Sequence, residues 1–330
     1  MRKAIIAAAA GLFVLFGAAA LFGAVTMAAA ADYPDRPITI VVGFPPGGAS
    51  DIMARILTAK LGSLLGQPFV VDNRPGAGGN VAGEIVAHAA PDGYTILLGN
   101  NAILATNASL YAKVGFDPEK DFDPISLIGT QANVLVVNLT VPAHSLAELI
   151  ALAKANPGKL NFASSGYGLA AHLAGELFKT EAHIDIVHVP YKGSAPALQD
   201  VMAGDDQMMF ATTSGVMGFL KNGELRPLAV TTLKRTATLP DVPTMNESGL
   251  PGFEATTWHG LVAPVGTPKA IVETLHRAVV EALKDPDVAQ KLSGLGIDPV
   301  GSAPDEFRAY IKSEIPKWAA VIKASGAKMQ

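Results

Sequence analysis

A turn rich in glycine and proline, residues 43–51, constrains this chain most, because it separates a short apolar segment from a long one with helical periodicity. Residues 38–42 are mostly β-branched and predict a buried strand, and the apolar residues of 52–65 recur at helical spacing. Ser50 or Asp51 is placed to cap the first helical turn. Such a turn presents bare N–H groups at a helix N-terminus, where an anion is favoured. The alternative is a tight connection that needs glycine for its geometry alone.

The same pattern of strand, polar turn and helix occurs again in the first hundred residues. Residues 68–72 predict a second strand, the glycine-rich stretch 73–80 a turn, and residues 81–90 a helix. A third strand over 94–98 ends at the polar stretch 99–102. Strands that alternate with helices predict parallel βαβ units, whose ligands bind outside the carboxyl ends of the strands. We therefore expect all three turns to lie on one edge of one sheet.

The order then begins again, which predicts a second α/β domain built on the same plan. The expected helices cover residues 145–156, 170–180 and 195–203, and the expected strands cover 134–138, 160–163, 184–189, 207–210 and 225–231. A chain of 330 residues exceeds the usual size of a single core, so two domains are expected. We place the crossings between them near Thr130 and Trp258. Two late helices, 268–285 and 304–325, are expected to pack on the first domain.

The first residues predict an export signal rather than part of the fold. Arg2 and Lys3 precede an apolar run over residues 4–27, and three alanines at 29–31 supply a cleavage site. We expect a signal peptide over residues 1–31 and a periplasmic location, although an uncleaved anchor is the alternative. The chain contains no cysteine and carries a formal net charge of −4. The acidic balance argues against nucleic acid as a partner, so none is expected.

Enzymatic alternatives have little support in the sequence. Residues 166–171 match a dinucleotide-binding pattern followed by Asp185, but an exported protein meets few such cofactors. A hydrolase would need Ser164 or Ser165 with His172, and the usual nucleophile elbow is absent. The seven histidines are scattered, no His-x-x-x-His pair occurs, and cysteine ligands are missing. We expect no enzyme activity, no cofactor and no metal.

Repetition strengthens the interpretation of the turns as an anion site. One helix end contributes about 0.3–1 kcal/mol, which is too little for specific capture. Several ends, each with charge-assisted hydrogen bonds of about 1.5–3 kcal/mol, together approach the roughly −8 kcal/mol of micromolar binding. Contributions from both domains are then needed, and Lys192 is a candidate cation between them. Its alternative role is that of a solvated lysine in a turn.

Many short motifs, in order along nearly the whole mature chain, give a specific family resemblance. The chain resembles the solute-binding proteins of tripartite tricarboxylate transporters, the Bug or TctC-like family. The motifs are Tyr33-Pro34, Arg36-Pro37-Ile38, Phe44-Pro45-Pro46-Gly47-Gly48, Asp51, Ala54-Arg55, the stretch 73–79, Pro91-Asp92-Gly93-Tyr94-Thr95, Ser165-Gly166, His172-Leu173, Val189-Pro190-Tyr191-Lys192-Gly193, and Leu239-Pro240-Asp241-Val242-Pro243-Thr244.

The resemblance implies a type II-like periplasmic binding protein with two α/β lobes, each a mostly parallel sheet flanked by helices. It implies lobe 1 from residues 32–130 plus 259–330 and lobe 2 from 131–258, closing over a small organic acid. Delivery would be to the membrane permease subunits of the transporter, and signalling to a membrane partner is the alternative. The ligand-binding positions carried over are Phe44, Pro46, Gly47, Gly48, Asp51, Asn101, Ser165, Gly166, Gly168 and Lys192.

This sequence departs from the family pattern at Ala211-Thr212, where many relatives carry an aspartate. An aspartate there would suit a ligand with an amino group. Its absence favours a plain mono- or dicarboxylate over an amino acid.

Overall fold

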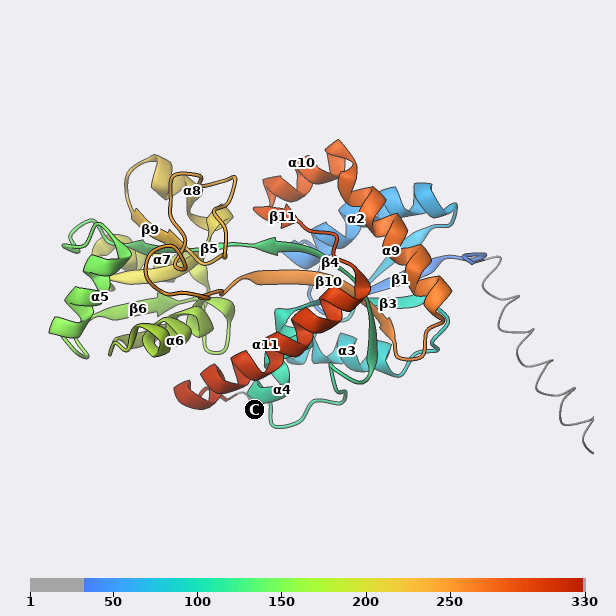
Figure 1. Ribbon diagram of the computed structural model, residues 1–330, viewed down its shortest axis with the longest axis horizontal. Coiled ribbons are helices and arrows are strands. Elements are labelled where there is room, and N and C mark those ends of the chain that lie inside the picture. Colours follow the sequence, from blue (N-terminus) through green and yellow to red (C-terminus); the bar gives the residue numbers. More distant parts are fainter. Residues whose placement is uncertain (1–32, 329–330) are drawn as a thin grey trace, which may run out of the picture.

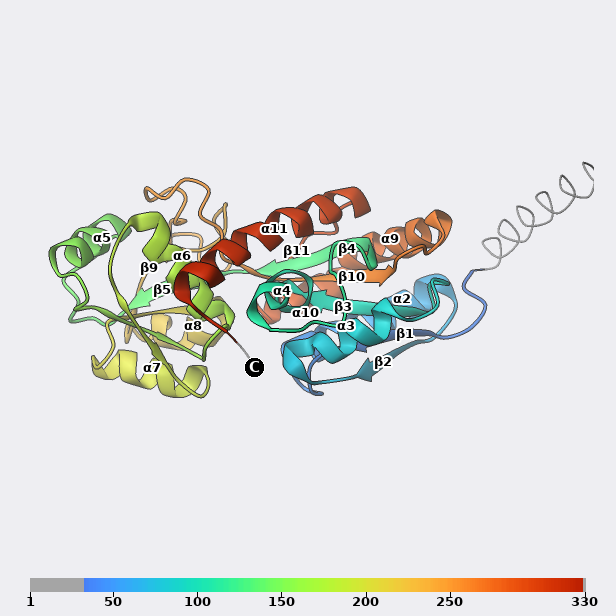
Figure 2. The same cartoon turned by 90° about the horizontal axis from the view of Figure 1, so that it is seen from below.

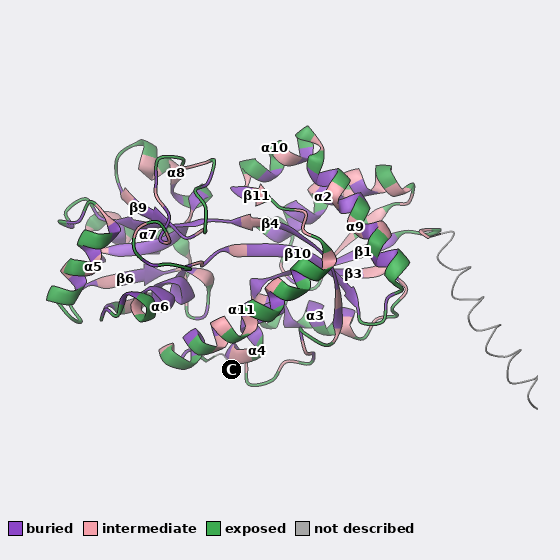
Figure 3. Cartoon of the chain, viewed as in Figure 1, coloured by how far each residue is buried: buried purple, intermediate pink, exposed green. Residues whose placement is uncertain are grey.

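The computed structural model describes residues 33–328, so the predicted signal peptide lies outside the described residues. Two sheets lie end to end along the molecule and form two lobes (Figure 1). Most residues of the strands are buried between helices (Figure 3). Within residues 33–328 no helix is both long and apolar enough to cross a membrane.

The first sheet has six strands in the order β11-β4-β10-β3-β1-β2. Their bounds are β1 Ile38–Val42, β2 Phe69–Asn73, β3 Thr95–Asn100, β4 Phe122–Gln131, β10 Thr257–Pro264 and β11 Ile297–Pro299. Strand β1 pairs in parallel with both β2 and β3. The three predicted strands at the start of the chain therefore end at one edge of the sheet, as expected.

The second sheet has five strands in the order β7-β6-β8-β5-β9. Their bounds are β5 Asn133–Val137, β6 Asn161–Ser164, β7 Val187–Pro190, β8 Met208–Thr212 and β9 Arg226–Val230. Strand β6 pairs in parallel with β7 and β8. The prediction of two α/β lobes is confirmed.

Both sheets are mixed, which corrects the expectation that each is mostly parallel. Strands β4, β10 and β11 pair antiparallel in the first sheet, and β5 pairs antiparallel with β8 and β9 in the second. The physical reason lies in the connection between the lobes. Strand β4 runs out of the first sheet and continues as β5 after one residue, while β10 returns beside β4 in the opposite direction.

These pairings fix which way the strands point. Strand β4 runs toward the second lobe, and β10 is antiparallel to it. Because β3 is antiparallel to β10, it runs in the same direction as β4. Strands β1 and β2 are parallel to β3, so all three end toward the second lobe. Strand β5 runs away from the first lobe, so β8, β6 and β7 end toward it. The carboxyl ends of the parallel strands in the two lobes therefore face each other. We call the region between them the interlobe face.

Helices cover both faces of each sheet. Helices α2, α9 and α10 share an apolar cluster on one face of the first sheet, and α7 and α8 do so on one face of the second. A third cluster runs through both lobes and includes residues of α3, α5, α6 and α11. The bounds are α2 Ala49–Leu65, η1 Ala77–Gly79, α3 Asn80–Ala87, η2 Ala102–Thr106, α4 Asn107–Leu110, α5 Leu146–Ala155, α6 Ala170–Ala182, α7 Ser194–Ala203, α8 Thr213–Lys221, α9 Lys269–Lys284, α10 Pro286–Gly294 and α11 Pro304–Ser325.

The last helix, α11, packs on the first lobe as expected and also contacts the second lobe. It packs on β4 and η2 in the first lobe and on α6 in the second (Figures 1 and 2). A helix of 22 residues is about 33 Å long, which is enough to pass from one lobe to the other. Its apolar side belongs to the core, with Phe307, Ile311 and Trp318 buried.

One side chain links the lobes directly at the crossing. Gln131, the last residue of β4, donates from Nε2 to the carbonyl of Leu295 at 2.8 Å and to Ser214 Oγ of α8 at 3.1 Å. Leu295 follows α10 in the first lobe, and α8 begins where β8 ends in the second. This contact lies beside the two connecting strands.

Candidate functional site: the interlobe face

The turn between β1 and α2 brings a helix N-terminus to the interlobe face. Gly47 has φ +82°, a conformation that glycine adopts without steric strain. The first intrahelical bond of α2 runs from the Ile52 N–H to the Gly48 carbonyl at 2.9 Å. The N–H groups of residues 49–51 precede that bond and carry the positive end of the helix dipole. The first lobe therefore presents a helix N-terminus with unpaired backbone N–H groups at the interlobe face.

Asp51 does a different job from the predicted one. The N-cap residue of α2 is Gly48 and no side chain caps the helix, so the expectation that Ser50 or Asp51 caps the first turn is wrong. The buried Asp51 carboxylate instead accepts from the Gly47 N–H at 2.9 Å, from Arg55 Nε at 3.0 Å and from Asn73 Nδ2 at 3.0 Å. The hydrogen bond from Arg55 is the largest cause that lowers the pKa of Asp51 to about 2. Asp51 thus braces the turn as a permanent anion.

The remaining predicted residues of the first lobe lie close to this brace. Asn73 Nδ2 also donates to the Phe44 carbonyl at 3.0 Å, and the Phe44 ring packs against the core. A Cβ atom at Gly43 would lie 2.8 Å from the Cα of Gly79, so the first and second turns touch through bare backbone. Pro46 is exposed, and Asn101 is buried immediately before η2.

The second lobe presents its own turn, between β6 and α6, at the interlobe face. The Gly166 N–H donates to Ser164 Oγ at 3.2 Å and the Gly168 N–H donates to His172 Nδ1 at 2.9 Å. The first bond of α6 runs from the Leu173 N–H to the Leu169 carbonyl at 3.0 Å. As in the first lobe, glycine N–H groups are used to build the turn. The donors left for a ligand are those of the first helical turn.

A stack of aromatic rings supports this second turn. The rings of His172 and His188 stack with centroids 4.0 Å apart, and Tyr167 meets both edge to face. Burial lowers the pKa of His172 to about 3 and that of His188 to about 4, so both are neutral at pH 7. Ser164 Oγ lies 2.6 Å from His188 Nε2. The hydrolase alternative required Ser164 or Ser165 to pair with His172. In the structure Ser164 pairs with His188 instead, and His172 accepts from the backbone N–H of Gly168.

Lys192 lies at the edge of the second turn. It follows β7 and its side chain is exposed. Its neighbour Gly193 donates its N–H to the Ser165 carbonyl at 3.1 Å, which joins the loop after β7 to the turn after β6. Lys192 is thus held beside Ser165 and Gly166 by a short backbone contact.

The two lobes touch next to these turns. A Cβ atom at Gly168 in the second lobe would lie 2.7 Å from Cδ2 of Leu110, the last residue of α4 in the first lobe. The structure thus brings predicted residues of both lobes to facing edges. It also adds three residues that sequence reasoning did not select, namely Asn73, His188 and His259. Asn73 lies in the predicted turn 73–80 but was not selected as a site residue, whereas His188 and His259 act through Ser164 and Ser50, which are distant in the chain.

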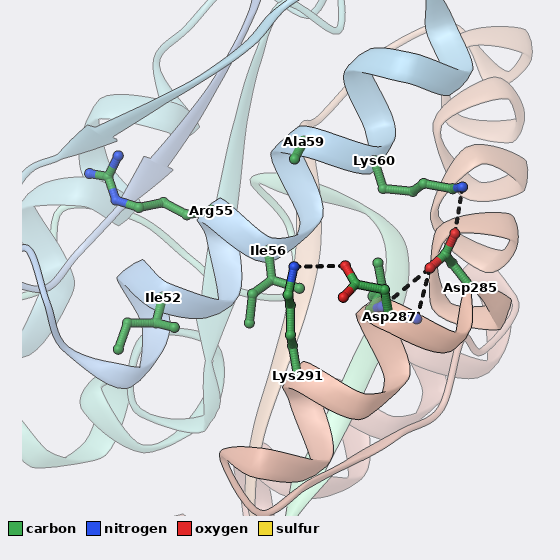
Figure 4. A pocket seen from close by; sticks show the side chains of 9 residues that line it. Ile52, Arg55, Ile56, Ala59, Lys60, Asp285, Asp287 and Lys291 are labelled. Atoms are coloured by element: carbon green, nitrogen blue, oxygen red, sulfur yellow. Dashed lines mark hydrogen bonds and ion pairs between the residues drawn. The ribbon is translucent and has the colours of Figure 1, made fainter.

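A separate surface pocket of about 530 Å³ lies between α2 and α10 (Figure 4). Ion pairs join Lys60 to Asp285 at 2.6 Å and Lys291 to Asp287 at 2.7 Å along its wall. None of the ten predicted ligand-binding residues lines it. Its charged groups largely pair with one another. No group of three or more His, Asp or Glu side chains suited to a metal ion lies within residues 33–328.

The fold and the facing helix N-termini define a two-lobed solute-binding protein. The family model described as the tripartite tricarboxylate transporter family receptor, TctC, matches residues 53–327. The chain belongs to this family, as its motifs indicated. It is 41% identical over 299 residues to the protein BugT of Bordetella pertussis, covering 90% of this chain and 92% of BugT.

Two solved structures are also similar to this chain. One is an R. palustris protein with adipate, at 40% identity and a TM-score of 0.72, covering 90% of this chain and all of that one. The other is MatC from Rhodopseudomonas palustris with bound malate, at 35% identity and a TM-score of 0.69, covering 88% of this chain and all of MatC. The matched family is described as one of transporter receptors.

Proposed function

We propose that this protein captures a small carboxylate between its lobes in the periplasm and delivers it to a tripartite tricarboxylate-type permease. The observation that carries the proposal is the opposition of two helix N-termini, those of α2 and α6, across the interlobe face. Each offers N–H groups ahead of its first intrahelical bond. A carboxylate gripped by both would stabilise a closed arrangement of the lobes.

The ligand class that fits best is a dicarboxylate without an amino group. The two similar structures hold adipate and malate, which are both dicarboxylates. Strand β8 ends at Ala211 and Thr212, so no carboxylate is present at the position where an amino group would be recognised. The exposed Lys192 provides a cation beside the second turn. The ionised Asp51 carboxylate is already bonded to Arg55 and Asn73, so it is not available to bind an amino group of a ligand.

We place the lobe division where the chain crosses between the two sheets. Lobe 1 would comprise residues 32–130 plus 259–330, and lobe 2 residues 131–258. Gln131 lies at this boundary and donates to both sides. Rotation of the lobes would move Leu295 relative to Ser214, so Gln131 Nε2 could not keep both bonds. The hinge therefore has one contact that depends on closure.

The proposal is tested by native mass spectrometry of the protein purified from the periplasm, followed by release and identification of bound small molecules. A stoichiometric organic acid is the expected result. Thermal-shift measurements with a panel of mono-, di- and tricarboxylates should then show stabilisation that rises with ligand concentration. An empty protein with no shift across the whole panel would refute carboxylate capture. Delivery is tested separately by uptake in cells that lack the permease.

A further inference from the structure

A buried serine and histidine pair lies under the turn of the first lobe. Ser50, in the first turn of α2, has its Oγ 3.0 Å from Nε2 of His259 in β10, across 209 positions of sequence. Ser50 is 7% exposed and His259 is 3% exposed. Within residues 33–328, Ser50 Oγ has no hydrogen-bond partner other than His259. The direction of this single bond decides what the serine hydroxyl can do.

The surroundings of His259 make its ring neutral. Side chains alternate along a strand, so His259 shares a face with Leu261 and Ala263, which belong to the apolar cluster under α2. Burial alone lowers the pKa of His259 to about 4, with no charged neighbour contributing. A neutral imidazole has one N–H and one bare nitrogen. The ring therefore exists in one of two tautomers at pH 7.

The unpartnered nitrogen selects between these tautomers. His259 Nδ1 is buried and has no hydrogen-bond partner in the described part of the chain. A proton on Nδ1 would be a buried donor without an acceptor, which is the more costly kind of orphan. A proton on Nε2, by contrast, has an acceptor, because Nε2 donates it to Ser50 Oγ. With its oxygen accepting that bond, Ser50 retains its own hydroxyl proton without an acceptor in the protein.

We propose that His259 is a positioning residue that holds Ser50 as a hydrogen-bond acceptor and thereby directs the Ser50 hydroxyl proton to the bound carboxylate at the N-terminus of α2. This inference rests on the proposed function, since it supplies a side-chain donor to the same anion. The donor sits among the N–H groups of residues 49–51, which point the same way. A hydroxyl that is almost fully buried and lacks an acceptor is the natural partner for a ligand oxygen.

The second lobe shows why this assignment is specific to Ser50. His188 Nε2 lies 2.6 Å from Ser164 Oγ, and His188 Nδ1 is also buried without a partner. Ser164 Oγ, however, accepts from the Gly166 N–H and donates to the Gly166 carbonyl, both at 3.2 Å. Its hydroxyl is used to build the turn. Of the two pairs, only the one in the first lobe leaves a proton for a ligand.

The same assignment argues against a hydrolytic role for the pair. A histidine base must hold a lone pair on the nitrogen that faces the serine. In His259 that nitrogen carries the proton and donates it, so the ring cannot take the proton of Ser50. The pair binds and orients rather than reacts.

The tautomer is tested first, on the wild-type mature chain and without ligand. Nitrogen NMR of ¹⁵N-labelled histidine rings, assigned by the signals missing from His259→Gln, should show His259 protonated at Nε2 and bare at Nδ1 between pH 6 and 8. A proton on Nδ1 would overturn the proposal. This measurement does not depend on the folding of any variant other than the one used for assignment.

Binding is tested by calorimetry with adipate as the probe, and with malate if adipate does not bind. We expect Ser50→Ala and His259→Leu each to weaken binding about tenfold, and the double variant to be no weaker than Ser50→Ala alone, because the two act as a unit. Glutamine carries an N–H as many bonds from Cβ as His259 Nε2, so His259→Gln should bind within about threefold of wild type.

Two results would contradict the positioning role. One is wild-type affinity in His259→Leu, and the other is an equal loss in His259→Gln and His259→Leu at equal unfolding midpoints. If the wild-type chain binds neither acid nor any other carboxylate of the panel, the proposed function and the ligand role of Ser50 both fail. The ring signals still decide the tautomer in that case, so the two failures are distinguishable.

Discussion

The buried carboxylate of Glu314 accepts the indole N–H of Trp258 at 2.9 Å and so joins α11 to the strand β10 that connects the lobes. The same carboxylate accepts from Trp318 Nε1 at 2.8 Å and pairs with Lys317. Glu314→Ala would leave two buried indole donors without acceptors, so we expect a loss of about 2–4 kcal/mol in the free energy of unfolding. Urea denaturation measures this loss.

The control for Glu314 is Glu281→Ala, which removes an exposed carboxylate 3.9 Å from Lys284 on α9. Exposed ion pairs contribute about 0–1 kcal/mol, so this variant should unfold close to wild type. Equal losses in the two variants would mean that the link between α11 and β10 adds nothing to stability.

Gly47→Pro should abolish ligand binding while leaving the fold largely intact. Proline fixes φ near −65°, whereas Gly47 has φ +82°, and proline also removes the N–H that Asp51 accepts. The turn would therefore lose both its conformation and its brace. Gly166→Pro, at φ +147°, should act in the same way on the second turn. Calorimetric titration and circular dichroism measure binding and fold.

Gly252→Pro is a matched control for Gly47→Pro. Gly252 has φ +80° and donates its N–H to Asn246 Oδ1 at 2.8 Å, but it lies in the connection between β9 and β10 rather than in a predicted ligand turn. The backbone strain should be similar and the binding should survive. Retained affinity in both the Gly47 and the Gly166 variants would refute the site assignment.

Asp51→Asn should weaken ligand binding although it preserves the shape of the side chain. A neutral amide accepts more weakly from the Gly47 N–H and loses the ion pair with Arg55, which holds the Asp51 side chain at 3.0 Å. We expect a loss of about 1–2 kcal/mol in stability and roughly tenfold in affinity. A variant that binds more tightly would show that Asp51 repels the ligand instead of bracing the turn.

Stability should fall as the pH is lowered from about 6.5 toward 4, with buried histidines among the causes. Burial lowers the pKa of His188 and His259 to about 4 in the folded state, whereas the unfolded chain binds these protons near pH 6.5. The unfolded state therefore binds more protons in this window, and each such histidine removes about 1.4 kcal/mol per pH unit. The pKa of Asp51 is about 2, so its contribution stays constant there.

The measurement is urea denaturation of the wild type and of His259→Gln at pH 7, 6 and 5. The variant lacks one of the titrating groups. Its free energy of unfolding should therefore fall less steeply with decreasing pH, by the slope that corresponds to about one bound proton. Carboxyl groups with raised pKa, such as Glu254, act in the opposite direction in both proteins and cancel in the comparison. Identical slopes would mean that His259 has the same pKa in the folded and unfolded chains.

The sequence by itself determined the local structure and the family. Apolar periodicity predicted β1, α2 and most later elements, and glycine-rich turns marked the strand ends that meet at the interlobe face. The sequence missed α8 and α10, which are short and follow their neighbours without a clear break. These successes and misses share one cause, because periodicity and turn chemistry are set by residues close together in the chain.

Only the tertiary structure decided which donors remain for a ligand. The glycines at 47, 166 and 168 were expected to grip the anion, yet the structure shows each N–H already bonded within its own turn. The order of strands put β10 beside β3, which brought His259 under Ser50, and the length of α11 joined both lobes. Such contacts depend on how strands pair and helices pack over hundreds of residues. Residues close together in the chain do not determine that arrangement. The sequence alone therefore located the turns, and the tertiary structure determined which of their donors are free to bind a ligand.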